Sequence, residues 1–398
     1  MAGHDVPVDV AVIGGGIVGA ACSYYLARAG LRVTLIEREF PAARTSGACE
    51  GNILLWDKEV SRELPLGARS LALWKELVGE LELDFEYHRK GSIMVAEDAA
   101  GLAALRRKLA DLAAVGVSGT FLGARELNTE EPALAPDLPG GALFPDDGQV
   151  DPRYATNALV EGARRLGVHV QAGTVVHRLI LGQGRIEAVE TSTGRIPAKA
   201  IVLAAGVWTR EIAAAAGVDL PVHPRKGQIV VVGRGPTVVH RKLMEAGYVG
   251  TVESSAATLQ VAMVAESTRT GTLLLGSSRE LVGFDRQVSL ATVAAIAARA
   301  LRFLPGLSSA RCIRTYAGLR PFSPDHLPLI GPVTAVDGLY VATGHEGSGI
   351  SLAPATGRLI AQWITGQALD FPAAWFGPDR FQGGQGTHNA TQAVVHGG

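Results

Sequence analysis

Two apolar runs with a helical segment between them open the chain. Residues 10–13 are apolar and mostly β-branched and end at a glycine, which predicts a buried strand. Residues 17–29 predict a helix, and residues 31–36 a second strand that ends at Glu37. The order strand, helix, strand predicts a βαβ unit with parallel strands.

The same patterns continue along the chain, with amphipathic stretches predicting helices and short apolar runs predicting strands. Helices are expected at 64–83, 101–114, 151–166 and 353–365, and strands at 92–95, 168–172, 186–191, 228–233, 258–265 and 272–277. Two further apolar strands, within 196–206 and 338–352, run into glycines that precede a helix. These repeated strand–glycine–helix segments predict one nucleotide-binding domain assembled from distant parts of the chain.

The predicted fold class is α/β, with a Rossmann-like nucleotide-binding domain and a second, antiparallel-sheet substrate domain of α+β type. We assign 1–90, 150–225 and 315–380 to the first domain, and 91–149 and 226–314 to the second. The glycine-rich polar segment 382–398 is expected to be a mobile tail.

Three glycines at the end of the first strand carry the clearest chemical signal. Gly14, Gly16 and Gly19 fit the pattern G-x-G-x-x-G, in which the glycines allow a tight turn, a close diphosphate and close helix packing. The following helix offers its N-terminal N–H groups to the diphosphate. Glu37 follows Gly14 by 23 residues, near the spacing of an acid that binds a ribose hydroxyl. The motif predicts a dinucleotide cofactor and leaves FAD and NAD both open.

Net charge, cysteine content and hydropathy argue against several classes of function and of site. The net charge of −1 gives no indication of nucleic-acid binding. The three cysteines, Cys22, Cys49 and Cys312, are scattered, which argues against a disulfide framework, a structural metal site or an iron–sulfur cluster within this chain. No transmembrane segment or secretory signal is visible, so a cytoplasmic location is expected.

The motifs resemble the FAD-dependent D-amino-acid oxidase superfamily, which includes glycine oxidase, sarcosine oxidase and D-amino-acid dehydrogenases. The matching blocks are VAVIGGGIVGAACSYYLARAG, ARTSGACEGN, IVLAAGVWT, PRKGQ, TYAGLRPFSPDHLPLIGPV and GLYVATGHEGSGISLAPATGRLIA. They follow the family's order over nearly the whole chain. The last two look most like the β subunits of heteromeric hydroxyproline and opine dehydrogenases and the flavoprotein subunits of hydrogen cyanide synthase.

The resemblance implies FAD, and it distributes the cofactor contacts along the chain. It assigns Gly14, Gly16 and Gly19 to the diphosphate, Glu37 to the ribose, and Arg38 and Val176 to the adenosine side. It places Thr45, Ser46 and Gly47 beside the flavin ring and the diphosphate, Ala205 and Gly206 close to the cofactor, and Gly344, Gly347, Gly349 and Ile350 at the flavin. Sarcosine oxidases tether flavin through a cysteine just ahead of the final motif, and Cys312 lies near that point. Its neighbours do not match the tethering motif, so noncovalent FAD is expected.

Arg320 is the main substrate candidate. In similar oxidases the arginine of this motif pairs with the substrate carboxylate, which a planar guanidinium binds through two parallel hydrogen bonds. His345 is the best titratable candidate, with a purely structural contact as its alternative. Tyr248 is a further pocket candidate. Glycine oxidase places a pocket tyrosine on a strand where this chain aligns Ala262, which leaves the substrate open.

The function expected is oxidation of the C–N bond of a small amino or imino acid, such as a D-amino acid, glycine or hydroxyproline. A hydride would pass from Cα to flavin N5, and the imine would then hydrolyse in water. One alternative is a flavin-bearing β subunit that passes electrons to a partner chain, either a second flavoprotein or an iron–sulfur subunit. A nicotinamide-dependent dehydrogenase is the other alternative.

Overall fold

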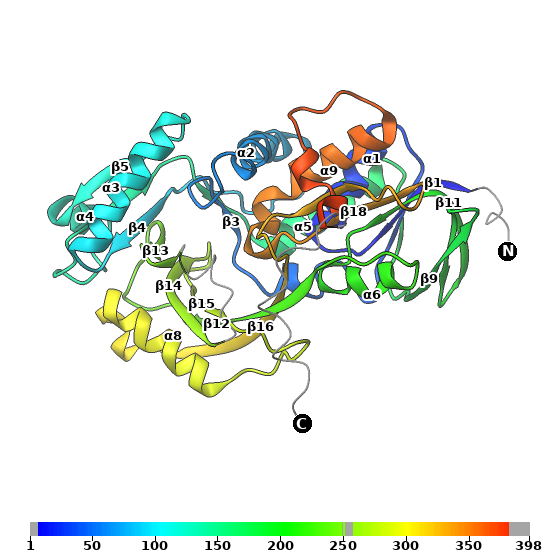
Figure 1. Ribbon diagram of the computed structural model, residues 1–398. Helices are drawn as coiled ribbons and strands as arrows, with labels where there is room; N and C mark the ends of the chain where they lie inside the picture. The colour runs from blue at the N-terminus through cyan, green and yellow to red at the C-terminus, as the bar shows by residue number, and fades with distance from the viewer. Residues whose placement is uncertain (1–6, 249, 251–257, 382–398) are drawn as a thin grey trace.

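The computed structural model describes residues 7–248, 250 and 258–381, which form two large sheets with helices packed around them (Figure 1). The tail expected at 382–398 lies outside the described residues. The first sheet has the order β17 (Leu329–Pro332), β18 (Leu339–Thr343), β11 (Gly194–Leu203), β1 (Val8–Ile13), β2 (Val33–Ile36) and β8 (His169–Gln171), and β10 (Arg185–Thr191) and β9 (Val176–Gly182) extend from β11.

The first sheet is parallel in its centre and buried on both faces. β1 pairs in parallel with β11 and β2, and β11 pairs in parallel with β18. Val10 and Val12 of β1 pack into the cluster on one face, whereas Ala11 and Ile13 pack into the cluster on the other. Burial on both sides explains why the sequence shows an unbroken apolar run here rather than alternation.

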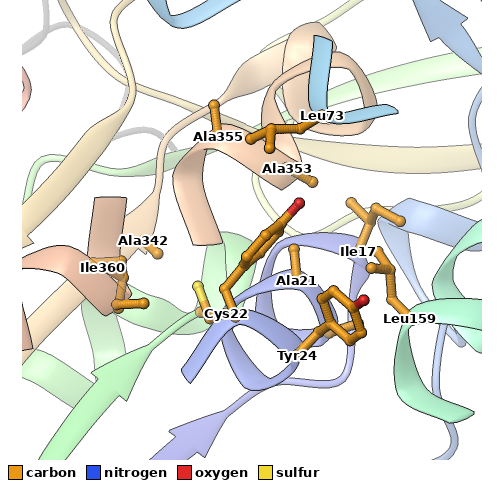
Figure 2. Close-up of a cluster of buried hydrophobic side chains, with 14 of the residues drawn as sticks. Ile17, Ala21, Cys22, Tyr24, Leu73, Leu159, Ala342, Ala353, Ala355 and Ile360 are labelled. Atoms are coloured by element: carbon orange, nitrogen blue, oxygen red, sulfur yellow. The ribbon is translucent and has the colours of Figure 1, made fainter. Parts of the chain in front are cut away.

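Four helices cover one face of this sheet: α1 (Ile17–Arg28), α2 (Glu63–Glu80), α5 (Pro152–Arg165) and α9 (Gly349–Thr365). α6 (Thr209–Ala214) lies on the other face. Figure 2 shows Ala21 and Cys22 of α1 in the same buried cluster as Ala353 and Ala355 of α9. The two helices cross closely because their contact residues are small.

The second sheet has the order β16 (Cys312–Phe322), β12 (His223–Val232), β15 (Leu273–Arg279), β14 (Gln260–Ser267), β13 (Lys242–Glu245), β4 (Ser92–Ala96), β6 (Gly140–Phe144) and β5 (Thr120–Gly123). Its pairs are antiparallel apart from β13–β4, which is parallel. The expectation of an antiparallel sheet is corrected at this pair. The two strands come from distant segments, so no hairpin dictates their direction.

Helices also cover the second sheet. α8 (Leu290–Phe303) packs on β14, β12 and β15, whereas α3 (Ala99–Ala114) and α4 (Ala124–Glu130) pack on the strands at the other end (Figure 1). A short ladder of β3 (Asn52–Ile53) and β7 (Gly148–Gln149) completes the strands. None of the described helices is long and apolar enough to cross a membrane.

One predicted helix starts earlier than expected. The sequence placed a helix at 353–365, but α9 begins at Gly349 and contains Pro354. A proline cannot donate to the carbonyl four residues before it, which here is Ile350 O. Trp74 Nε1 of α2 donates to that carbonyl at 3.2 Å. The proline is therefore tolerated because a neighbouring helix supplies the missing donor.

Candidate active site

A cavity of about 1700 Å³, counting its open mouth, lies where the two sheets meet. The first sheet contributes the carboxyl ends of β1, β2, β11 and β18, together with the N-termini of α1 and α9. The second sheet contributes β12 and β16, and the segment 43–52 lies along the same wall. Carboxyl ends of parallel strands are where open α/β sheets bind ligands.

The glycine motif shapes one end of the cavity. Gly14 has a φ of +112°, and a Cβ on it would lie 2.4 Å from Ala204 O of the strand segment beside it. A Cβ on Gly19 would lie 1.9 Å from Gly14 O, so this glycine lets the helix approach the turn. Gly16 is the N-cap of α1, carries no capping side chain and lines the cavity. The helix terminus therefore presents backbone donors to the cavity.

Glu37 and Arg38 follow at the end of β2 and line the same region. Glu37 Oε2 accepts a hydrogen bond from Gly15 N–H at 2.7 Å, and burial raises the pKa of this carboxyl. The Arg38 guanidinium lies 3.8 Å from the ring centroid of Trp208. Val176, at the start of β9, lines this end as well.

The middle of the cavity is formed by loops from three parts of the chain. Ser46 Oγ accepts from Ile17 N–H at 3.0 Å, and Thr45 Oγ1 donates to Leu319 O at 2.6 Å. These bonds fix the 45–47 turn between α1 and β16. Ala205 and Gly206 after β11, and Gly347, Gly349 and Ile350 at the start of α9, complete the lining.

Three of the expected cofactor residues do not line the cavity. A Cβ on Gly47 would lie 2.1 Å from Ala42 O, and a Cβ on Gly344 would lie 2.7 Å from Leu329 Cδ1. Together with Gly19, these glycines allow close packing behind the wall. Their contacts with a cofactor, like those of the lining residues, stay predictions.

Arg320 lies at the other end, on β16. Its Nη1 donates to Ser278 O of β15 at 2.9 Å, which uses one of the five donors that a guanidinium carries. Burial lowers the pKa of Arg320, and Arg279 lowers it further, but a guanidinium stays protonated in proteins. A fixed cation with donors directed into a cavity can bind a carboxylate.

The sequence reasoning missed the ion pair that anchors this end. Arg225 is the register partner of Arg320 on β12, and its Nη1 donates to Glu346 Oε1 at 2.7 Å. Both charged side chains are almost fully buried. Glu346 has a φ of +47°, an uncommon backbone conformation for a residue other than glycine. The pair ties the second sheet to the turn before α9. Both residues stand in blocks quoted for the resemblance, but only the strand register shows that they meet.

Glu346 is held as a carboxylate by its surroundings. Burial alone would raise its pKa, but the hydrogen bond with His326 and the nearby guanidinium groups lower the pKa below its usual value. His326 Nδ1 lies 3.5 Å from Glu346 Oε2. Arg279 also faces this carboxylate, with 3.8 Å between Nε and Oε1.

His345 and Tyr248 both line the cavity. His345 Nε2 lies 3.0 Å from Thr356 Oγ1 of α9, and burial lowers the pKa of this histidine to about 3. The imidazole is therefore neutral at physiological pH and a weak base. Tyr248 is buried, and the Arg279 guanidinium lies 4.6 Å from its ring centroid.

Comparison with known proteins identifies the family. The chain matches the family model described as FAD dependent oxidoreductase over residues 9–363. This chain belongs to the DAO family of FAD-dependent oxidoreductases. The cofactor is FAD, which removes the NAD alternative that the glycine motif left open.

Individual relatives cover nearly the whole chain. Hydrogen cyanide synthase subunit HcnC of Pseudomonas aeruginosa is 30% identical over 94% of this chain and 96% of its own length. Glycine oxidase of Geobacillus kaustophilus is 30% identical over 94% of this chain and 97% of its own. The crystal structure of that glycine oxidase superposes with a TM-score of 0.85 at 28% identity, covering 94% of this chain and 99% of the other.

The cavity of this DAO-family chain fits FAD. It extends from Glu37 at the end of β2, past the N-terminus of α1, to Arg320 on β16. Cys312, the cysteine considered as a tether, is exposed and is not among the residues that line the cavity. Cys49 does line the cavity, but burial raises the pKa of its thiol well above the usual value, so it stays protonated. These observations agree with noncovalent FAD.

Proposed function

We propose that this chain oxidises the C–N bond of a small amino or imino acid, with Arg320 binding the substrate carboxylate. The observation that carries the proposal is a partly buried guanidinium on the wall of the FAD cavity, fixed to β15 by one hydrogen bond. Two relatives with about the same length are named as a glycine oxidase and a hydrogen cyanide synthase subunit, which supports amino-acid chemistry.

FAD supplies the hydride acceptor when it is bound, so the protein needs no metal for this chemistry. The role of the chain is to bind the substrate and to orient it. Arg320 fixes the carboxylate through parallel charge-assisted hydrogen bonds, which also fixes the direction of the neighbouring Cα–H. The low-dielectric protein wall around Arg320 strengthens these bonds relative to the same bonds in water.

The ion pair of Arg225 and Glu346 stabilises the elements next to Arg320. Their ion pair joins β12, the strand beside Arg320, to the turn that precedes α9. Glu346 also contributes negative charge near the guanidinium groups, so the cluster is not left with three uncompensated cations. His345 stays neutral and contributes a hydrogen bond to Thr356 rather than a titrating base.

Anaerobic reduction of the bound flavin tests the proposal. Purified holoprotein is mixed with glycine, sarcosine, D-alanine, hydroxyproline and an opine, and the loss of flavin absorbance is recorded. At least one of these compounds is expected to reduce the flavin and so to bleach its absorbance. Arg320→Met should raise the substrate concentration needed by about 100-fold while FAD content is unchanged. Arg314→Met, an exposed arginine on the same strand, is the matched control. Unchanged reduction of the Arg320 variant would remove the proposed role.

A second candidate is a flavin-bearing subunit of a larger assembly. The relative named as a hydrogen cyanide synthase subunit matches almost end to end, which favours this candidate. The three cysteines are scattered through the described structure, so iron–sulfur chemistry would have to come from a partner chain. Fast oxygen turnover with peroxide formation by the isolated chain indicates a standalone oxidase. Turnover with artificial dyes alone, together with copurification of a second redox protein, indicates the subunit.

A further inference from the structure

Glu50 places a buried carboxylate on the wall of the cavity, and neither the motifs nor the proposed function uses it. Its side chain is 9% exposed and lines the same cavity as Arg320. Oε2 lies 3.6 Å from Lys242 Nζ and 3.4 Å from Asn52 Nδ2. Oε1 is buried and accepts no hydrogen bond from any described residue. An unsatisfied buried carboxylate oxygen is costly unless something else supplies a donor.

Lys242 does not account for Glu50, because it has a closer partner. Lys242 Nζ donates to Glu266 Oε2 at 2.6 Å, and Glu266 Oε1 accepts from Gly51 N–H at 3.2 Å. Burial alone would lower the pKa of Lys242, but the two carboxylates raise it, so Lys242 is charged. Lys242 is therefore paired with Glu266, and Glu50 Oε1 is left without a hydrogen-bond donor among the described residues.

Glu50, from the segment 43–52, and Arg320, from β16, both lie close to β15 of the second sheet. A Cβ on Gly276 would lie 2.6 Å from Glu50 Oε1, and a Cβ on Gly227 would lie 2.1 Å from Arg320 Nη1. Each charged group thus occupies space that a glycine leaves open. Arg320 Nη1 also donates to Ser278 O, so both charged groups lie against the same stretch of β15.

Opposite charges on one cavity wall suit the two charges of an α-amino acid. Its nitrogen and carboxyl carbon are about 2.5 Å apart, as the bond lengths N–Cα and Cα–C require. One charge-assisted hydrogen bond of about 2.8 Å at each end would connect these groups to Glu50 and Arg320. The positive end of the cavity would face the carboxylate and the negative end the nitrogen.

We infer that Glu50 is the nitrogen-binding residue of the substrate site, with Oε1 accepting a hydrogen bond from the N–H of the amino or imino acid whose carboxylate Arg320 binds. This inference rests on the proposed function. It specifies the substrate class as zwitterions whose nitrogen keeps at least one N–H. Nitrogen-free carboxylic acids of the same skeleton bind through Arg320 alone.

The test compares two ligands in two charge-matched variants. The ligands are the amino acid that best reduces the wild-type flavin and the carboxylic acid of the same carbon skeleton without nitrogen. Dissociation constants come from the concentration dependence of anaerobic reduction and from perturbation of the flavin spectrum. Glu50→Gln should weaken the amino acid about 10- to 100-fold and the carboxylic acid less than about threefold. Glu245→Gln removes a buried charge of the same sheet that pairs with Arg299 and does not line the cavity, and should change neither ligand by more than about threefold.

Two results would overturn the inference. One is Glu50→Gln with wild-type affinity for the amino acid, and the other is an equal loss for both ligands. If Glu50→Gln does not fold, Glu50→Asp keeps the charge on a shorter arm and should lose affinity for the amino acid selectively. Wild-type behaviour of Glu50→Asp would count against the inference. If no amino acid reduces the wild-type flavin, the proposed function fails together with this inference. If the wild type is reduced and the Glu50 variants match it, this inference alone fails.

Discussion

At the scale of single residues, the position of Arg320 depends on Gly227. The guanidinium occupies the space where a side chain at 227 would begin, with 2.1 Å between that Cβ position and Nη1. Because β12 and β16 are paired in register here, neither backbone can move without breaking the ladder. The side chain of Arg320 must therefore give way to any substitution at 227.

We expect Gly227→Ala to displace the Arg320 guanidinium and to raise the dissociation constant for the amino acid about tenfold or more. Flavin content should stay near the wild-type value, because the dinucleotide end of the cavity is distant in the fold. Gly79→Ala, where a Cβ meets open space on α2, serves as the control. The measurement is anaerobic reduction against substrate concentration. Wild-type affinity in Gly227→Ala would show that Arg320 does not bind the carboxylate.

A second expectation at this scale concerns His345 and pH. In the unfolded chain this histidine has its ordinary pKa of 6.5, whereas burial in the fold lowers the pKa to about 3. Below pH 6.5 the unfolded state therefore binds a proton that the folded state does not. The stabilisation is fully present above pH 6.5 and is lost at about 1.4 kcal/mol per pH unit as the pH falls towards 3.

His345→Gln removes this proton linkage. We expect the free energy of unfolding of the wild type to fall by about 2 kcal/mol more than that of the variant between pH 7 and pH 5. Urea unfolding at a series of pH values measures both curves. Parallel curves would mean that His345 is already protonated in the folded state over this range.

At the scale of elements, the crossing of α1 and α9 positions both helix N-termini at the cavity. Gly357 lies at the crossing, and a Cβ there would be 2.6 Å from the backbone carbonyl of Ala21. Figure 2 shows how closely the small residues of the two helices approach. Backbone lies on both sides of this contact, so one added methyl group must separate the helices.

We expect Gly357→Ala to lower the free energy of unfolding by about 1–3 kcal/mol and to lower the FAD content of the purified protein. The loss of FAD follows because Gly16 and Gly349 line the cavity from the two helices that move apart. Chemical denaturation and the ratio of flavin to protein absorbance measure the two effects. Stability equal to that of Gly79→Ala would show that the crossing relaxes without cost.

The sequence predicted the elements whose patterns are local. The run at 10–13 and the glycines after it predicted β1 and α1 because both depend on neighbouring residues. The helix at 290–303 was not predicted, although its buried residues Thr292, Ile296, Ala300 and Phe303 recur at helical spacing. The start of α9 was predicted four residues too late. Pro354 is tolerated inside this helix because Trp74 of another helix supplies the missing donor, and the sequence alone does not show that contact.

The same distinction applies to the candidate site: residues in local motifs were predicted, and contacts between distant strands were not. The resemblance gave Arg320, and the structure adds the register that puts Arg225 opposite it. Glu50 lies within the quoted block ARTSGACEGN, but the lack of a donor to its Oε1 among the described residues appears only when β15 lies over it. Contacts between strands far apart in the sequence cannot be read from spacing.

At the scale of the whole molecule, FAD is expected to act as part of the fold, because the cavity combines residues from 13 to 350 along the chain. A ligand that binds only the folded state stabilises it by about 2.7 kcal/mol at one hundred times its dissociation constant. We expect FAD, but not NAD, to raise the melting temperature of the apoprotein by a few degrees. Trichloroacetic acid should leave the yellow colour in the supernatant. No shift with FAD, or a yellow pellet, would contradict this.

The most direct test of the whole account is a crystal structure of the holoprotein with an unreactive carboxylate ligand. The account predicts FAD along the cavity, with its adenosine end at Glu37, and the carboxylate about 2.8 Å from the nitrogens of Arg320 beside the flavin ring. A carboxylate bound elsewhere, with Arg320 facing away from the ring, would contradict the central claim that this guanidinium anchors the substrate.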